Sequence, residues 1–96
     1  MDLPSGVLDA LAPVLPSLQR AGFQPVTVKV SASFGDFIVN FSNGRRELSI
    51  RRDRGQCIVS GPSRSTLKAA GLWRAFEGAQ ELSVPLSAWL QGDAGT

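Results

Sequence analysis

The chain has 96 residues, 43% of them hydrophobic, and a formal net charge of +2. This length and composition suit a single globular domain over residues 1–96 and exclude a disordered chain. The charge permits an anionic partner without requiring one, and no apolar run approaches the ~20 residues that a membrane span needs.

The first predicted element is a helix over residues 3–21, because leucines recur there at spacings of three and four and so share one helical face. These leucines are Leu8, Leu11, Leu15 and Leu18. Pro13 and Pro16 each remove a backbone amide and crowd the preceding turn, so we expect a kink or a split near Ala12. Gly22 suits the position just after the helix.

Alternating apolar residues predict two further elements. VTVKVSA, residues 26–32, reads as a half-buried strand with Val26, Val28, Val30 and Ala32 on its apolar side. FIVNFSNGRRELSI, residues 37–50, reads as a hairpin around Asn43-Gly44, a two-residue turn that pairs Phe41 with Arg46. We expect helices to pack on one face of this sheet. That face carries Val28, Val30, Phe37, Val39, Phe41, Leu48 and Ile50.

The next turn lies in SIRRDRGQCIV, residues 49–59, and two geometries fit it. A two-residue turn at Arg54-Gly55 pairs Ile50 with Val59 and places Cys57 on the apolar face. A three-residue turn with a glycine bulge pairs Ile50 with Ile58 instead. Hydrophobic alternation favours the first, whereas the unfavourable positive φ of an arginine favours the second.

The C-terminal third predicts helical segments. Residues 63–77 have a helical pattern that ends at Gly78, with one of two inner faces: Leu67, Ala70 and Trp73, or Ala69, Trp73 and Phe76. ELSVPLSAWLQG, residues 81–92, predicts a short strand and then a helix, with Ser83 as cap and Leu86, Trp89 and Leu90 inward. Residues 91–96 read as a loose tail. The whole chain predicts an α+β domain: N-terminal helix, four-stranded antiparallel meander, C-terminal helical segments.

The residue types argue against an enzyme. The chain has no histidine and a single cysteine, Cys57, so no imidazole activates the thiol and no Cys or His cluster binds a metal. The acidic residues are scattered, and none falls at a spacing that pairs two carboxylates. We therefore expect no catalytic residue, no metal and no cofactor. A lone cysteine and a start without a basic segment favour the cytoplasm.

Two patterns raise the question of anion binding. GPSRSTLK, residues 61–68, opens a helix and offers a site formed by Ser63, Arg64, Ser65 and Lys68, although a serine there is more often a helix cap. Arginines also cluster in two turns, near Arg45 and near Arg54. A meander puts these turns at opposite ends of the sheet, about 20 Å apart at ~3.3 Å per residue. Stacking aromatics are missing from the predicted outer face, and interspersed acids suggest a solvated surface.

Several segments carry a resemblance to small bacterial immunity-like proteins, which neutralise toxins. They are LDALAPVL, residues 8–15; AGF, residues 21–23; FGDFIVNF, residues 34–41; and LSIRRDRGQCIV, residues 48–59. Similar chains often have an aromatic residue at the position of Cys57. The resemblance implies a non-catalytic cytoplasmic protein that binds another protein, such as a toxin domain, and occludes its functional surface.

The charged turn is the expected partner-binding site. It comprises Arg51, Arg52, Asp53, Arg54 and Gln56. Arginine pairs with carboxylates through two parallel hydrogen bonds and is enriched among interface hot spots, while mixed charge improves specificity. The alternative function is nucleic-acid binding through the arginine-rich turns, which would weaken steeply with salt.

Overall fold

A computed structural model describes residues 3–31 and 35–94 of the chain. In chain order it contains α1 (Ser5–Leu11), α2 (Leu15–Arg20), β1 (Gln24–Val30), β2 (Phe37–Ser42), β3 (Glu47–Asp53), β4 (Gln56–Ser60), α3 (Arg64–Ala69) and α4 (Ala79–Ala94). The strands form one antiparallel sheet in the order β1-β2-β3-β4. The α+β meander predicted from the sequence is confirmed. Among the described residues, no helix is long and apolar enough to cross a membrane.

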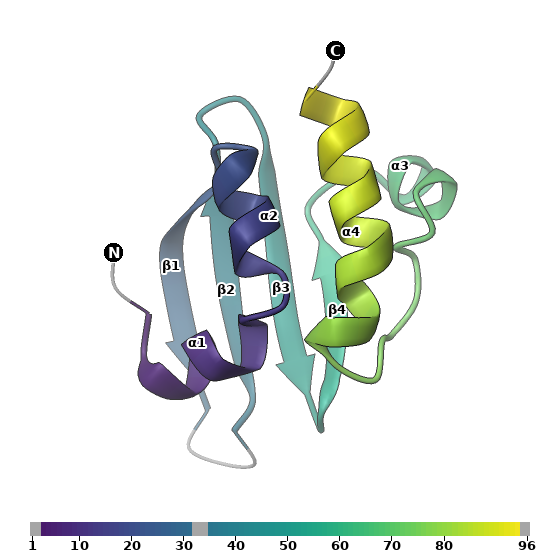
Figure 1. The fold of residues 1–96 in the computed structure, drawn as a ribbon. Helices are drawn as coiled ribbons and strands as arrows, with labels where there is room; N and C mark the ends of the chain where they lie inside the picture. Colours follow the sequence, from purple (N-terminus) through teal and green to yellow (C-terminus); the bar gives the residue numbers. More distant parts are fainter. Residues whose placement is uncertain (1–2, 32–34, 95–96) are drawn as a thin grey trace.

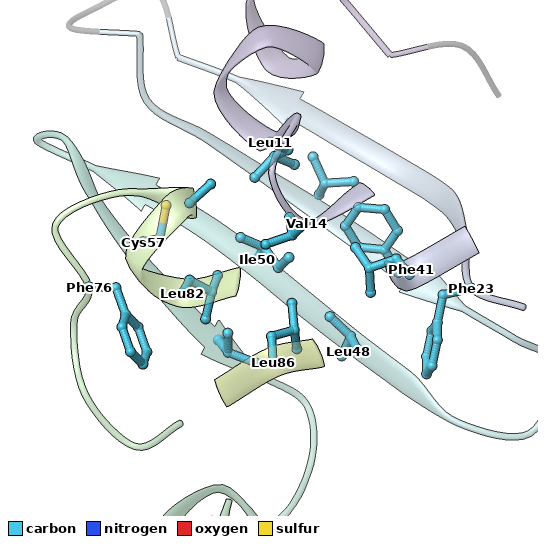
Figure 2. Packing of buried hydrophobic residues seen from close by; sticks show 14 of the residues in the cluster. Leu11, Val14, Phe23, Phe41, Leu48, Ile50, Cys57, Phe76, Leu82 and Leu86 are labelled. Atoms are coloured by element: carbon cyan, nitrogen blue, oxygen red, sulfur yellow. The ribbon is translucent and has the colours of Figure 1, made fainter. Parts of the chain in front are cut away.

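Figure 1 shows α1, α2 and α4 lying over one face of the sheet, with α3 beside β4. The core lies between these two layers, and Figure 2 shows Phe41, Leu48 and Ile50 of the sheet directed toward Val14 and Leu86 of the helical layer. Every fully buried side chain among the described residues is hydrophobic. The sheet face away from the helices, called the uncovered face below, bears Thr27, Lys29, Ile38, Asn40, Ser49, Arg51 and Ile58.

The N-terminal helix divides where the prolines predicted a break. α1 ends at Leu11 and α2 begins at Leu15, with Pro16 in its first turn, where a missing amide costs nothing. The predicted leucine face is only partly correct. Leu11 and Leu18 are buried and Leu15 is half-buried, but Leu8 is exposed because α1 buries Val7 and Leu11, four residues apart, and Val14 takes a core position between the helices.

The first strand departs from its predicted pattern. Val28 packs against the core, but Val26 is 48% and Val30 54% exposed, so the expectation of a buried Val30 is wrong. A β-bulge between Pro25 and Thr27 leaves Val26 without a partner, and Val30 lies at the end of an edge strand. Ala32, expected on the same side, lies outside the described residues.

The β2–β3 hairpin has a different register from the predicted one. Phe41 pairs with Leu48 and not with Arg46, because the central turn residues are Gly44 and Arg45. The Asn43 amide donates to the Arg46 carbonyl at 3.2 Å, and the Asn43 Oδ1 accepts from the Arg45 and Arg46 amides at 2.9 and 2.7 Å. Gly44 at φ +87° takes the first central position, as in a type II′ turn. The predicted buried residues of β2 and β3 are nevertheless all buried.

The C-terminal elements differ most from expectation. α3 stops at Ala69 and does not reach residue 77, because the Gly71 and Leu72 amides donate back to the Lys68 and Leu67 carbonyls in a Schellman motif. The next segment is irregular. Phe76 leaves it to exchange two backbone hydrogen bonds with Cys57 of β4, at 2.8 and 2.9 Å. Trp73, expected inward in both predictions, is half exposed.

α4 replaces the predicted strand and helix with one helix through Pro85. Its buried residues Ala79, Leu82, Leu86 and Leu90 recur at helical spacing, whereas Val84 is 74% exposed. Ser83 is therefore no cap: its hydroxyl donates to the Gln80 carbonyl inside the helix. Leu86 and Leu90 are buried and Trp89 is half-buried, as expected. α4 runs to Ala94, so residues 91–94 of the predicted tail are helical, and residues 95 and 96 lie outside the described part.

Candidate functional site

The turn between β3 and β4 has the two-residue form that hydrophobic alternation favoured. Ile50 pairs with Val59 and Asp53 with Gln56, which leaves Arg54 and Gly55 as the two central residues. Both have positive φ, +52° and +83°, as a type I′ turn requires. Arg54 is the one described non-glycine residue in this region of φ, so the turn places an arginine where asparagine or glycine is normally found.

A neighbouring carboxylate holds the turn in place. The Arg54 backbone amide donates to Oδ1 of Asp36 at 2.9 Å, and the Asp36 carbonyl accepts from the Ser31 amide at 2.8 Å. Asp36 lies just before β2, so it ties the start of that strand to the tip of the β3–β4 hairpin. Among the described residues, the Arg54 guanidinium itself makes no hydrogen bond or ion pair and remains exposed. The backbone of the tip is thus fixed while its charged group stays available.

The strain at Arg54 has a measurable consequence. Replacing Arg54 with asparagine, which tolerates positive φ, should raise the free energy of unfolding by up to about 1 kcal/mol. The Asp36 bond would survive because it uses the backbone amide. Thermal unfolding followed by circular dichroism tests this, with Arg45→Asn as the control at an exposed position of the other hairpin. A lower melting temperature for Arg54→Asn alone would show that the guanidinium stabilises the fold.

Strand alternation separates the predicted site residues onto two faces. Arg51 pairs with Ile38 and Ile58 on the uncovered face, and its guanidinium lies 3.8 Å from the Asp53 carboxylate. Arg52 pairs with Phe37 and Cys57, so it belongs to the helix-covered face and is half-buried. The structure therefore brings Arg51, Asp53 and the tip Arg54 together, and places Arg52 on the other side of the sheet.

Gln56 connects the hairpin to the irregular segment before α4. Its Nε2 donates to Oε1 of Glu77 at 3.4 Å, beside the backbone bridge between Cys57 and Phe76. Gln56 is exposed, but its amide is partly committed to this contact. It supports the tip of the hairpin from the β4 side, as Asp36 does from the β2 side.

Cys57 is a core residue. Its side chain is 2% exposed, and burial raises the pKa of the thiol, an effect that the nearby Arg52 charge only partly opposes. A raised thiol pKa lowers the thiolate fraction at neutral pH and so suppresses nucleophilic reactivity. This agrees with the two-residue turn, which places Cys57 on the apolar face of the sheet.

The second predicted site, Ser63, Arg64, Ser65 and Lys68, lies apart from the hairpin tip, around α3 (Figure 1). The Ser63 hydroxyl accepts from the Thr66 amide at 3.3 Å, which makes Ser63 the N-cap. The Arg64 guanidinium lies 5.4 Å from the centre of the Trp73 ring, a cation–π contact. Both side chains thus have structural roles, in agreement with the cap interpretation.

The two arginine-rich turns occupy opposite ends of the sheet, as the meander predicted. Arg45 and Arg46 lie in the β2–β3 turn, and Arg51, Arg52 and Arg54 lie at the far end of β3 (Figure 1). Glu47 and Asp53 are interspersed among them on β3. The described cations of the two turns therefore do not form one continuous basic stripe.

A pocket next to the hairpin tip was not expected from the sequence. It has a volume of about 350 Å³ and adjoins the ends of β1, β2 and β3. Its lining comprises Lys29, Val30, Ser31, Asp36, Phe37, Ile38, Arg51, Arg52 and Asp53. Lys29 enters the site because it pairs with Ile38, which in turn pairs with Arg51. The correct β2–β3 register would have shown that Ile38 and Arg51 are cross-strand neighbours, but the misplaced turn paired them with other residues.

No cluster of three or more potential metal ligands exists among the described residues. Comparison with family models, with curated proteins and with solved structures finds no match for this chain. The candidate site therefore rests on its own geometry: a tip fixed by Asp36, an exposed arginine at positive φ, and a partly charged pocket beside it.

Proposed function

We propose that this chain is a non-catalytic protein-binding module, an immunity-like cytoplasmic protein that occludes a partner's functional surface with its β3–β4 hairpin. The observation that carries the proposal is the conformation of Arg54. A strained, exposed arginine on a backbone fixed by Asp36 is costly to maintain, and such strain concentrates at functional sites. The resemblance of residues 48–59 to immunity-like proteins supports the same reading.

A fixed tip favours binding to a structured partner. Because the turn backbone is already ordered, association loses little conformational entropy there. The guanidinium groups of Arg51 and Arg54 would pair with carboxylates on the partner, so the partner's rim is acidic. The proposal includes no turnover by this protein itself, since Cys57 is buried and carries a raised thiol pKa.

The test is affinity capture of the partner from native cells, identification by mass spectrometry and measurement of the affinity with purified proteins. Arg51→Glu combined with Arg54→Glu should weaken binding by roughly thirtyfold or more, as the loss of two hot-spot arginines does. The matched control is Arg45→Glu with Lys68→Glu, which changes the charge equally at two exposed positions away from this hairpin. Equal affinities for the two folded double variants would refute the site.

Nucleic-acid binding is the alternative function, and the same two double variants distinguish it from binding to a protein partner. If it operates, a mobility shift with single- or double-stranded DNA appears at low salt and disappears as salt rises. Both double variants would then weaken binding similarly, because phosphate contacts depend on total charge more than on one turn. A partner-specific site predicts that only the Arg51 and Arg54 variant loses affinity.

A further inference from the structure

The uncovered face of the sheet carries one row of side chains that differs from its other rows. Across the four strands, Lys29, Ile38, Arg51 and Ile58 are consecutive cross-strand neighbours. The adjacent row is polar: Asn40 donates to the Thr27 hydroxyl and accepts from the Ser49 hydroxyl. The mixed row thus alternates a cation with an isoleucine, and both isoleucines are half-buried without any described element covering them.

The pocket beside the hairpin tip lies at the β1 end of this row. Lys29, Ile38 and Arg51 line it from the row, and the pocket extends around the ends of the strands to Val30, Phe37 and Arg52 of the helix-covered face. A volume of about 350 Å³ is large enough for one or two side chains of a partner. The pocket therefore offers an apolar surface with cations at its margin.

The charges around the pocket are unequal. Among the described residues, the Lys29 ammonium makes no hydrogen bond or ion pair and is exposed. The Arg51 guanidinium lies 3.8 Å from Asp53, a distance typical of a weak exposed pair. The Asp36 carboxylate already accepts the Arg54 amide. The lining thus carries three cations, Lys29, Arg51 and Arg52, against two carboxylates, Asp36 and Asp53, so an anionic group entering here meets an excess of positive charge.

We propose that this pocket, together with the Lys29–Ile38–Arg51 row, receives an acidic segment of the protein partner that carries an aliphatic side chain between its carboxylates. The carboxylates pair with Lys29 and Arg51, and the aliphatic group packs on Ile38, which lies between them on the same face. The inference deepens the proposed function, on which it rests, by adding Lys29 of β1 to the hairpin site and by specifying the chemistry of the partner's contact.

A short peptide tests the chemistry directly. The probe is the hexapeptide Glu-Glu-Leu-Glu-Glu-Leu, titrated into ¹⁵N-labelled protein and followed by NMR. We expect amide shifts concentrated at Lys29, Ile38 and Arg51. The peptides Gln-Gln-Leu-Gln-Gln-Leu and Glu-Glu-Ser-Glu-Glu-Ser should each bind at least about fivefold more weakly, because one lacks the charge and the other the aliphatic group. Equal binding of all three peptides, or shifts centred on another surface, would overturn the proposal.

Two variants with matched controls test the residues. Lys29→Glu should lower the affinity for the acidic peptide about tenfold. Arg45→Glu makes the same charge change at the opposite end of the sheet and should lower that affinity less than about threefold. Ile38→Thr should also weaken binding, while Ile58→Thr, in the same row but outside the pocket lining, should not. Unchanged melting of each variant shows that folding is intact. If Ile58→Thr and Ile38→Thr weaken binding equally, the pocket is not the site.

The native partner separates this inference from the proposed function. Loss of partner binding in the Arg51 and Arg54 variant but not in Lys29→Glu or Ile38→Thr refutes the pocket while the hairpin function stands. Loss of partner binding in the Lys29→Glu and Ile38→Thr variants as well supports both the pocket and the hairpin function. A competition experiment tests nucleic acid at the same surface. If a single-stranded DNA of equal charge displaces the acidic peptide at a lower concentration than the peptide itself needs for binding, the surface binds nucleic acid, and the proposal of an acidic protein segment is refuted.

Discussion

Replacing Phe41 with aspartate is expected to remove a large part of the protein's free energy of unfolding. Phe41 is 1% exposed and lies between Pro25 and Leu48 on the helix-covered face of the sheet. A carboxylate there would be buried without a partner, at a cost of at least about 4 kcal/mol, and a domain of this size is stable by only about 5–15 kcal/mol. Urea denaturation followed by tryptophan fluorescence and circular dichroism measures the effect.

The informative control is Val30→Asp. Strand alternation assigns Val30 to the same face as Phe41, but its side chain is 54% exposed. The structure predicts a loss of less than about 1 kcal/mol at Val30, typical of a surface position. Similar denaturation midpoints for the two variants would mean that the helical layer does not cover β2 as described.

Gly61→Ala should have the second largest effect. Gly61 follows β4, has φ +109° and approaches the start of β3 closely: an added Cβ would lie 2.9 Å from the Leu48 Cα and 3.0 Å from the Glu47 carbonyl oxygen. Both are backbone atoms of a central strand, so the clash is relieved only by moving β3 or the exit of β4. With the strain of positive φ added, we expect a loss on the order of 3 kcal/mol.

Gly71→Ala isolates the strain of positive φ from the clash. Gly71 has φ +73° at the end of α3, and nothing lies within 4 Å of its added Cβ. Its replacement should cost about 1 kcal/mol, the conformational term alone. The free energy of unfolding of both variants, measured in urea, gives the difference. Equal losses would show that the β3 backbone accommodates a methyl group opposite Leu48.

The sheet was predictable from the sequence because an error in the turn did not change the face of any side chain. Moving the turn centre from Asn43-Gly44 to Gly44-Arg45 shifts the pairing by two residues, which is the period of a strand. The buried residues of β2 and β3 were therefore predicted correctly despite the error. The pocket was missed because it depends on which residues are direct neighbours across strands, and Lys29, Ile38 and Arg51 were not aligned in the predicted register.

The C-terminal third could not be predicted from local pattern because tertiary contacts decide it. Phe76 fits a helical stripe in the sequence, but it bonds to Cys57 through its backbone, and a pattern in one segment contains no information about that partner. A short strand was predicted before the helix, yet the buried series at Leu82, Leu86 and Leu90 belongs to one helix that continues through Pro85. Burial of these leucines against the sheet outweighs the lost amide bond.

The backbone bridge between Cys57 and Phe76 makes the two borders of the sheet unequal. On the β4 border, the outward amide and carbonyl of Cys57 are already taken. On the β1 border no described strand pairs with the outer side, although Pro25, the bulge at Val26 and Lys29 make that border irregular and charged. Copies that join through their sheets into an open fibre need two free borders each. In this molecule the β4 border is interrupted at Cys57, which hinders the addition of a strand there and so disfavours ordered aggregation through the native sheet.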